Sequence, residues 1–360
     1  MTVSNPSAVV DPGLPASESG WRVRSPWRSG WTRFRRDRLS LVAACAFAVI
    51  LVASLGGGAA ASAILGHNGS DFLPYAASAN LKPVGPWTWV PATHQSYGYA
   101  NGDLAPPPPH AAKTLLVFGG DGPLGRDELI RVLDGGKTSL EIAIGGVLIA
   151  LLIGLPLGSI AGYFGGVADA VVGRFTETVM AFPLLLFLVF ASVQLDPVLR
   201  PIGWGTIFPS GVFAEALLIG VFTSFYPTRL VRGRLLQLRT VEFVEAAEMV
   251  GASDWRIIRR HLLPHLGPML LVWAAVATGT NILLEVGLSF IGAGVQPQTP
   301  TWGSLLSTTW GTVYQPQTYN STSYTPWQTI FPSLAILLCV VSLNQISEGL
   351  RHALEPRAER

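Results

Sequence analysis

Few residues of this 360-residue chain have the type and spacing that catalysis or metal binding needs. The run 135–138, Gly-Gly-Lys-Thr, looks like the end of a phosphate-binding loop, but that pattern needs a glycine five residues before Gly136, where Arg131 stands. Cys45 and Cys339 lie inside apolar runs and offer no metal-ligand spacing, and the six histidines are scattered. We therefore expect that this chain is not an enzyme and has no catalytic residues, no metal and no cofactor of its own.

Two polar residues, Asn281 and Glu285, stand inside a long apolar run. A carboxylate at mid-bilayer costs about 2.5–3.5 kcal/mol on insertion scales, so Glu285 is expected to face protein or water rather than lipid. One interpretation is a pair of residues that lines a transport pathway and meets charged or amide groups of a solute. The alternatives are hydrogen bonding between helices and a position near the outer interface, where the cost falls.

A third candidate is the segment Glu242–Pro264, which is polar and rich in arginine although it lies between two apolar runs. Its pattern predicts two short helices separated at a glycine. Gly251 can take the positive φ that ends a helix, and Ser253 or Asp254 can cap the next one. The second helix is basic, and Pro264 is expected to mark its end.

The composition indicates that these candidates are held in a membrane. Only 13% of the residues are charged and 49% are hydrophobic, whereas soluble domains carry about 25% charged residues. The net charge of +2 gives no support for nucleic-acid binding. We predict an all-α polytopic membrane protein with six apolar spans. They cover about residues 41–65, 138–163, 171–195, 212–230, 266–291 and 327–346.

Positive charge predicts how these spans are oriented. The N-terminal arm carries seven arginines and the segment Arg229–Arg260 carries seven more, whereas Gly292–Pro326 has no charged residue. Because cytoplasmic loops carry the excess of arginine and lysine, both termini and the Glu242–Pro264 segment are expected in the cytoplasm.

Five regions follow from this topology. They are a cytoplasmic basic arm (1–40), a first transmembrane helix (41–65), an extracytoplasmic Pro-rich insertion with a short amphipathic helix (66–137), a core with five transmembrane helices (138–346) and a cytoplasmic tail (347–360). The part at 66–122 is expected to be largely irregular. The amphipathic helix is expected over Leu124–Leu133, ended by Gly135 and Gly136.

Several strings in order resemble one family, the permeases of ABC importers in their dipeptide/oligopeptide (peptide/nickel) branch, and specifically the C-type permease. Glu245-Ala246-Ala247, Gly251 and Leu263-Pro264 match the spacing of the cytoplasmic EAA loop, although His261 stands where the general pattern has isoleucine. The other strings lie within 124–357. They are Leu124-Gly125-Arg126-Asp127, Ser139-Leu140, Ala161-Gly162-Tyr163-Phe164-Gly165-Gly166, Ala181-Phe182-Pro183, Arg229-Leu230-Val231-Arg232-Gly233, Leu288-Ser289-Phe290-Ile291-Gly292, then Pro300, Trp302 and Gly303, then Glu348-Gly349-Leu350-Arg351 and Leu354-Glu355-Pro356-Arg357.

The resemblance implies an ATPase-coupling loop between the fourth and fifth helices. Its residues are Glu242, Glu245, Ala246, Ala247, Gly251, Ala252, Asp254, Arg256, Arg259, Leu263 and Pro264. The resemblance further implies a multi-pass protein that is surrounded by lipid in a bacterial or archaeal cell (inner) membrane. Such a protein forms half of a transmembrane pathway for di- or oligopeptides. Its implied partners are a homologous second permease, two ATP-binding subunits that hold ATP and Mg, and an extracytoplasmic peptide-binding protein. The alternatives are a permease for nickel or another small solute, and a membrane scaffold without transport of its own.

Overall fold

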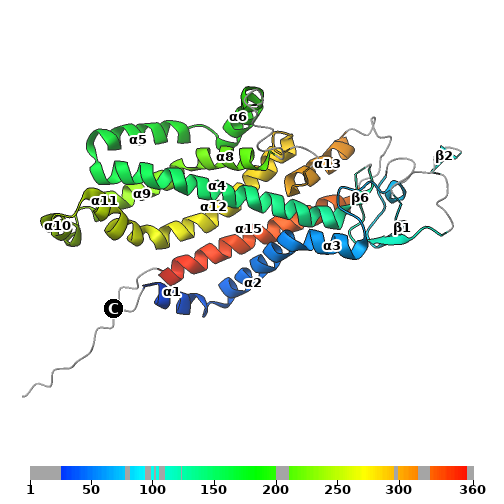
Figure 1. Ribbon diagram of the computed structural model, residues 1–360, viewed down its shortest axis with the longest axis horizontal. Coiled ribbons are helices and arrows are strands. Elements are labelled where there is room, and N and C mark those ends of the chain that lie inside the picture. Colours follow the sequence, from blue (N-terminus) through cyan, green and yellow to red (C-terminus); the bar gives the residue numbers. More distant parts are fainter. Residues whose placement is uncertain are drawn as a thin grey trace, which may run out of the picture.

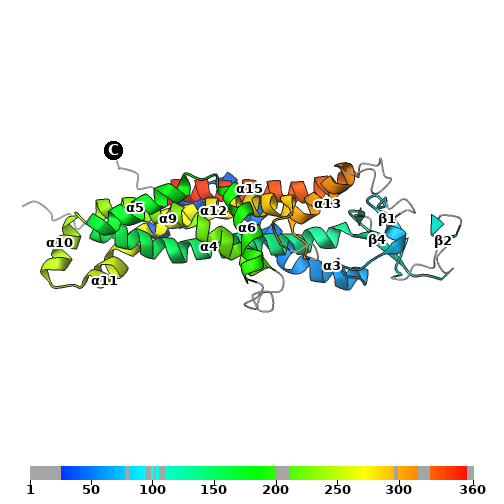
Figure 2. The same cartoon turned by 90° about the horizontal axis from the view of Figure 1, so that it is seen from above.

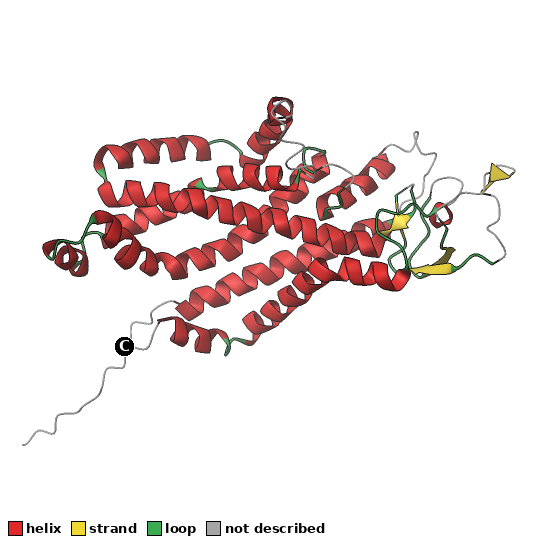
Figure 3. Cartoon of the chain, in the orientation of Figure 1, coloured by secondary structure: helices red, strands yellow, loops and turns green. Residues whose placement is uncertain are grey.

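The computed structural model of the chain is an elongated bundle of helices with small strands at one end (Figures 1 and 3). It describes residues 26–77, 82–93, 99–100, 103–104, 110–122, 124–199, 211–295, 299–314 and 325–354. The predicted N-terminal arm before residue 26, the prolines at 106–109 and the last six residues of the C-terminal tail lie outside the described residues.

Four long apolar helices run along the bundle. They are Arg38–Leu65 (α2, the π-helical η1 and α3), Glu128–Phe164 (α4), Asp254–Ile291 (α11, η4 and α12) and Pro326–Leu354 (α15). Within the described ranges these four are long and apolar enough to cross a membrane. A fifth is counted if α5 (Gly166–Met180) and α6 (Leu184–Leu199) are taken as one bent span. The chain is therefore an integral membrane protein of mostly helical structure.

The third and fourth predicted spans are not single straight helices. α5 and α6 meet at an angle of 89° around Pro183, and Figure 2 shows α6 running crosswise to the long axis. The fourth is divided at Ser224 into α8 (Val212–Thr223) and α9 (Phe225–Leu238). Proline has no N–H to donate and clashes with the preceding turn, so Pro183 and Pro227 each weaken the helix where it breaks.

α4 lies at the centre of the bundle and packs against α8, α9 and α12. Its glycines at 154, 158 and 162 face α9, and backbone and side-chain atoms of α9 lie close against them. A Cβ added at Gly158 would lie 2.6 Å from the carbonyl oxygen of Thr228, and one at Gly162 would lie 2.8 Å from that of Arg232. Small residues at this spacing allow the close approach of membrane helices.

The short helix predicted over 124–133 does not end at Gly135 and Gly136, because α4 is continuous from Glu128 to Phe164. That prediction was wrong for a reason of packing. A Cβ at Gly136 would lie 2.4 Å from Oγ of Ser54 and 2.8 Å from the ring of Trp302. The two glycines allow neighbouring elements to approach α4 rather than ending it.

The insertion at 66–122 has more regular structure than the sequence predicts. β1 (Thr88–Pro91) pairs with β4 (Lys113–Leu116), β2 (Tyr99–Ala100) with β3 (Asp103–Leu104), and β5 (Gly120–Asp121) with β6 (Arg126–Asp127), each antiparallel. Leu73, Ala76, Val90 and Leu116 form its small apolar core. Each strand has at most four residues, too few for a readable alternation of apolar and polar residues.

A buried His–Asp pair joins this insertion to the bundle. Nε2 of His67 lies 3.0 Å from Oδ2 of Asp127, and Oδ1 of Asp127 accepts the N–H of Leu129 at 2.9 Å as the N-cap of α4. The hydrogen bond to Asp127 raises the pKa of His67 above its ordinary value. The contact therefore ties the end of the first span to the start of the second.

The remaining helices lie at the two ends of the bundle. α1 (Pro26–Phe34) packs on α15, and α13 (Trp302–Tyr314) packs on α12 and α15. α1, α10 (Glu242–Met249) and the C-terminal end of α15 lie at one end, and the strands lie at the other (Figure 1).

Candidate functional site

The candidate loop begins with α10, an eight-residue helix that packs on the bundle through Val244, Phe243 and Ala247. Val244 is fully buried and contacts the cluster that contains Val231, Leu235 and Ile257. Glu242 and Glu245 lie in its first turn, where negative charge interacts favourably with the helix dipole. α10 is therefore seated on α9 and η4 with its charged face outward.

Gly251 ends this helix, as the sequence predicts. Its φ is +81°, and its N–H donates to the carbonyl of Glu248 at 2.9 Å. The N–H of Ala252 then donates to the carbonyl of Ala247 at 3.0 Å. A Cβ at Gly251 would meet no atom within 4 Å, so the position needs glycine for its backbone conformation and not for space.

The chain turns back into the membrane through α11 (Asp254–Arg256) and η4 (Ile257–Leu262). Ser253 occupies the N-cap without a side-chain hydrogen bond to the helix, and Asp254 instead accepts the hydroxyl of Tyr163 at 2.9 Å. Because Tyr163 belongs to α4, this contact fixes the turn to the centre of the bundle.

Pro264 does not end the second helix, contrary to the prediction. It lies in the first turn of α12 (Leu263–Ile291), and the helix continues from Asp254 to Ile291. Proline has no N–H for the carbonyl of Arg260, and the N–H of Leu263 donates to Ile258, five residues back. The local π-helix therefore lets the chain pass the proline without a break, so the loop and α12 form one continuous element.

The eleven predicted loop residues lie together at the end of the bundle (Figure 1). Ala247, Ala252 and Leu263 are half-buried, and the other eight are exposed. Ala246 therefore presents its methyl group outward, whereas Ala247 packs partly against its own chain. Asn281 and Glu285 do not belong to this group and lie within the bundle.

The structure adds three exposed apolar side chains to the loop. Met249, Val250 and Trp255 are 83%, 89% and 68% exposed, and they flank the turn at Gly251. Apolar residues in an otherwise charged segment were the signal that could have found them. Three exposed apolar side chains on one short loop favour a protein interaction surface.

Glu285 lies at the centre of a buried hydrogen-bond network between α4, α12 and α13. It is 0% exposed and accepts the hydroxyl groups of Ser139 at 2.7 Å and Ser289 at 2.8 Å. The Ser139 oxygen in turn accepts the backbone N–H of Trp302 at 3.2 Å, and the Trp302 indole donates to the carbonyl of Val132 at 2.9 Å. The network thus holds the start of α13 on α4.

Asn281 lies one helical turn from Glu285 and is also buried. Its Nδ2 donates to the carbonyl of Ala143 on α4 at 3.2 Å, and its exposed fraction is 1%. Glu215 in the first turn of α8 is a further buried carboxylate, 6% exposed, although its place near the end of a predicted span favours an interfacial position. The contacts of Asn281 and Glu285 fit the interhelical alternative, because both side chains bond across from α12 to α4.

Comparison with known proteins agrees with this architecture. Residues 154–360 match the family described as "Binding-protein-dependent transport system inner membrane component". The glutathione transport system permease protein GsiD of Pectobacterium atrosepticum is 31% identical over 335 residues, covering 93% of this chain and 92% of the relative. A putative peptide permease protein of Brucella ovis is 36% identical over 242 residues, 67% of this chain and 73% of the relative.

A solved structure, an inward-facing conformation of the MetNI methionine ABC transporter, is similar with a TM-score of 0.47 and 19% identity. It covers 62% of this chain and 96% of that chain. The family match spans more than half of the chain and the relatives extend along most of it. The chain therefore belongs to the family of inner membrane components of binding-protein-dependent transport systems.

Proposed function

We propose that this chain is the permease subunit of an ATP-driven ABC importer whose solute is a di- or oligopeptide. The observation that carries the proposal is the exposed loop of α10 and α11, which is continuous with the membrane helix α12. Two relatives support the solute class, because one is named for glutathione, itself a short peptide, and the other for peptides.

The proposed topology has six membrane segments, with α5 plus α6 as the third and α8 plus α9 as the fourth. Both termini and α10 are cytoplasmic. Charge supports this assignment, since the N-terminal arm and Arg229–Arg260 each carry seven arginines. In Figure 1, α1 and α10 lie at the same end of the bundle and the strands lie at the opposite end, so the strands are extracytoplasmic in this topology.

In the proposed mechanism, α10 docks on a partner ATPase and moves with it. The outward methyl of Ala246 permits close contact, and the apolar Met249, Val250 and Trp255 become buried by the partner. ATP and Mg are held by the ATPase chains, and this chain itself catalyses nothing. Because Val244 and Asp254 tie the loop to α9 and α4, displacement of α10 moves several helices together, as in rigid-body alternating access.

The remaining proposed partners are a homologous second permease, which completes the pathway, a second ATP-binding subunit, and an extracytoplasmic peptide-binding protein. Asn281 and Glu285 stay predicted pathway residues. Both are enclosed in this structure, so a solute reaches them only when α4, α12 and α13 separate.

The experiment is co-expression of this chain with a sister permease and ATPase chains, followed by affinity purification and site-directed crosslinking. A cysteine introduced at Met249 is expected to crosslink to an ATPase chain. A cysteine at Trp89, exposed on the opposite end, serves as the matched control and is expected not to do so. ATPase crosslinking from position 89 alone would contradict the proposal.

A further inference from the structure

Four arginines stand within residues 33–38, where the chain turns from α1 into α2. We call three of them, Arg35, Arg36 and Arg38, the basic turn. All three are exposed, and the described part of the chain gives their guanidinium groups no hydrogen bond and no ion pair. Neither the coupling loop nor the Glu285 network uses them, so their positive charge is available to a ligand.

The acidic side chains around the basic turn are engaged by other groups. Asp37 is the N-cap of α2, and its carboxylate also accepts the hydroxyl of Ser40. Glu348 on α15 lies 2.8 Å from Nη2 of Arg351 and 2.9 Å from Nε2 of His352, both on its own helix. The turn and the adjoining end of α15 therefore carry an excess of positive charge.

The basic turn is continuous with an apolar row on the first membrane helix. Arg38 is followed at intervals of three or four residues by Val42, Cys45, Val49 and Val52, so these five lie along one face of α2. The three valines are 67%, 69% and 71% exposed, and Cys45 is exposed as well. Because α2 is part of a candidate membrane span, this face meets lipid tails and Arg38 lies at their edge.

Helix stability does not account for an arginine at this place. Arg38 is the first residue of α2, where a positive charge interacts unfavourably with the helix dipole. Trp31 lies beside the turn, since its carbonyl accepts the N–H of Arg35 at 3.1 Å, and it is 60% exposed. Phe34 is buried against α15, where a Cβ at Gly349 would lie 3.0 Å from its ring. An exposed tryptophan next to basic residues is typical of the membrane–water interface.

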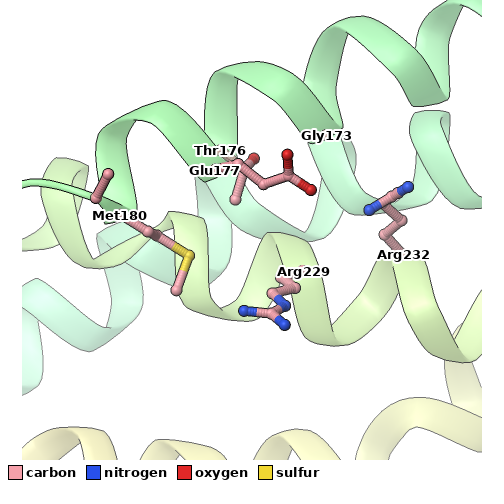
Figure 4. Close-up of a pocket in the computed structure, with 7 residues that line it drawn as sticks. Gly173, Thr176, Glu177, Met180, Arg229 and Arg232 are labelled. Atoms are coloured by element: carbon pink, nitrogen blue, oxygen red, sulfur yellow. The ribbon is translucent and has the colours of Figure 1, made fainter.

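The cavity between α5 and α9 offers no comparable surface. It has a volume of about 270 Å³, and Arg229 and Arg232 of α9 share it with Glu177 of α5 (Figure 4). Arg232 is already paired with Asp169, with Nη2 3.0 Å from Oδ2. The two positive charges are thus matched by two negative ones, whereas the basic turn has three arginines and a single acidic residue, Asp37.

We propose that the basic turn binds the phosphate groups of anionic phospholipids, with Trp31 in the headgroup layer and the exposed valines of α2 among the acyl chains. Clusters of basic residues beside a membrane helix attract anionic lipid surfaces in this way. Because Arg38 continues the exposed apolar face of α2, the phosphate belongs to a lipid and not to a soluble ion. The cytoplasmic leaflet follows from the proposed topology, but the contact with anionic lipid does not depend on it.

The test uses the purified full chain in mild detergent, with native mass spectrometry to measure bound lipid. Dioleoyl phosphatidylglycerol is the probe, and dioleoyl phosphatidylcholine is the neutral reference. The triple variant Arg35→Gln/Arg36→Gln/Arg38→Gln is expected to lower phosphatidylglycerol binding at least about fivefold, because one basic residue near an anionic surface already contributes about that factor. Phosphatidylcholine binding is expected to stay unchanged. The corresponding triple lysine variant keeps the charge and is expected to keep most of the binding.

The matched control is Arg256→Gln/Arg259→Gln/Arg260→Gln, because these arginines are also exposed and the change in charge is the same. It is expected to bind phosphatidylglycerol as the wild type does. Equal binding by the wild type and the basic-turn glutamine variant, or an equal loss in the control, would overturn the proposal. It would also be overturned if inorganic phosphate displaced phosphatidylglycerol, or if Arg36→Cys crosslinked to the sister permease in the assembled importer.

Discussion

Gly158 and Gly251 show two ways in which this chain uses glycine. At Gly158 the backbone is helical, and an added Cβ would lie 2.6 Å from a carbonyl oxygen of α9. At Gly251 the space is empty, but φ is +81°. The interior of the bundle therefore depends on contacts between segments far apart in sequence, whereas the loop at its end depends on local backbone conformation.

The largest expected effect comes from changing the interior glycine. Gly158→Ala places a methyl group against the backbone of Thr228, so α4 and α9 must separate. Such overpacking costs about 1–3 kcal/mol or more. Thermal unfolding in detergent is expected to show a markedly lower midpoint.

Gly233→Ala on α9 is the control, because its added Cβ meets nothing within 4 Å. It is expected to be neutral or slightly stabilising, since alanine favours helix. If the two variants unfolded at the same temperature, the close packing of α4 on α9 would not be a determinant of stability.

The next effect concerns the Glu285 network. Glu285→Leu leaves the hydroxyl groups of Ser139 and Ser289 without their acceptor, at a cost of about 1–3 kcal/mol. Glu285→Gln keeps an acceptor oxygen and is expected to lose less. Chemical denaturation in micelles measures both, and a larger loss for the glutamine variant would contradict the hydrogen-bond assignment.

The same contrast explains what the sequence could predict. The polar loop between apolar runs, the turn at Gly251 and the family all follow from residues close together in the chain. Four of the six predicted spans correspond to single long helices. The breaks at Pro183 and Ser224 were missed because hydropathy averages over a window and does not register a bend.

What could not be predicted depends on the partner of each residue. The sequence predicts a helix end at Gly136, whereas the structure shows that Ser54 and Trp302 pack against this glycine within a continuous helix. From the sequence, Glu285 fits a pathway residue and a structural residue equally well. The structural role becomes visible only because Ser139, 146 positions earlier, lies within hydrogen-bond distance. The passage through Pro264 also required knowledge of the π-helix before it.

The smallest expected effect is a pH dependence at the outer end. The Asp127 hydrogen bond raises the pKa of His67 in the folded protein, so protonated His67 stabilises the fold. That contribution is fully present below the unfolded pKa of about 6.5 and is lost as the pH rises through the higher folded pKa. Wild-type stability is thus expected to fall as the pH rises through this window.

His67→Gln removes the titrating group and serves as the control. Its unfolding midpoint is expected to lack the pH-dependent component that the wild type shows above the ordinary histidine pKa of about 6.5. An identical pH profile in the two proteins would show that the pair is not linked to stability.

The most direct test of the central claim is the rate of solute-stimulated ATP hydrolysis in the assembled importer carrying Ala246→Phe. Ala246 is exposed in this chain, so a bulky side chain there leaves the fold intact and obstructs only a docked partner. Ala60→Phe, at another exposed helical position, is the control. The proposed function predicts that stimulated hydrolysis and peptide uptake fall together in Ala246→Phe and stay normal in Ala60→Phe. The expected fall is at least about fivefold, because about 1 kcal/mol of overpacking weakens the docked contact by that factor. Normal hydrolysis and uptake by Ala246→Phe with the ATPases bound would contradict the assignment of α10 as the coupling element.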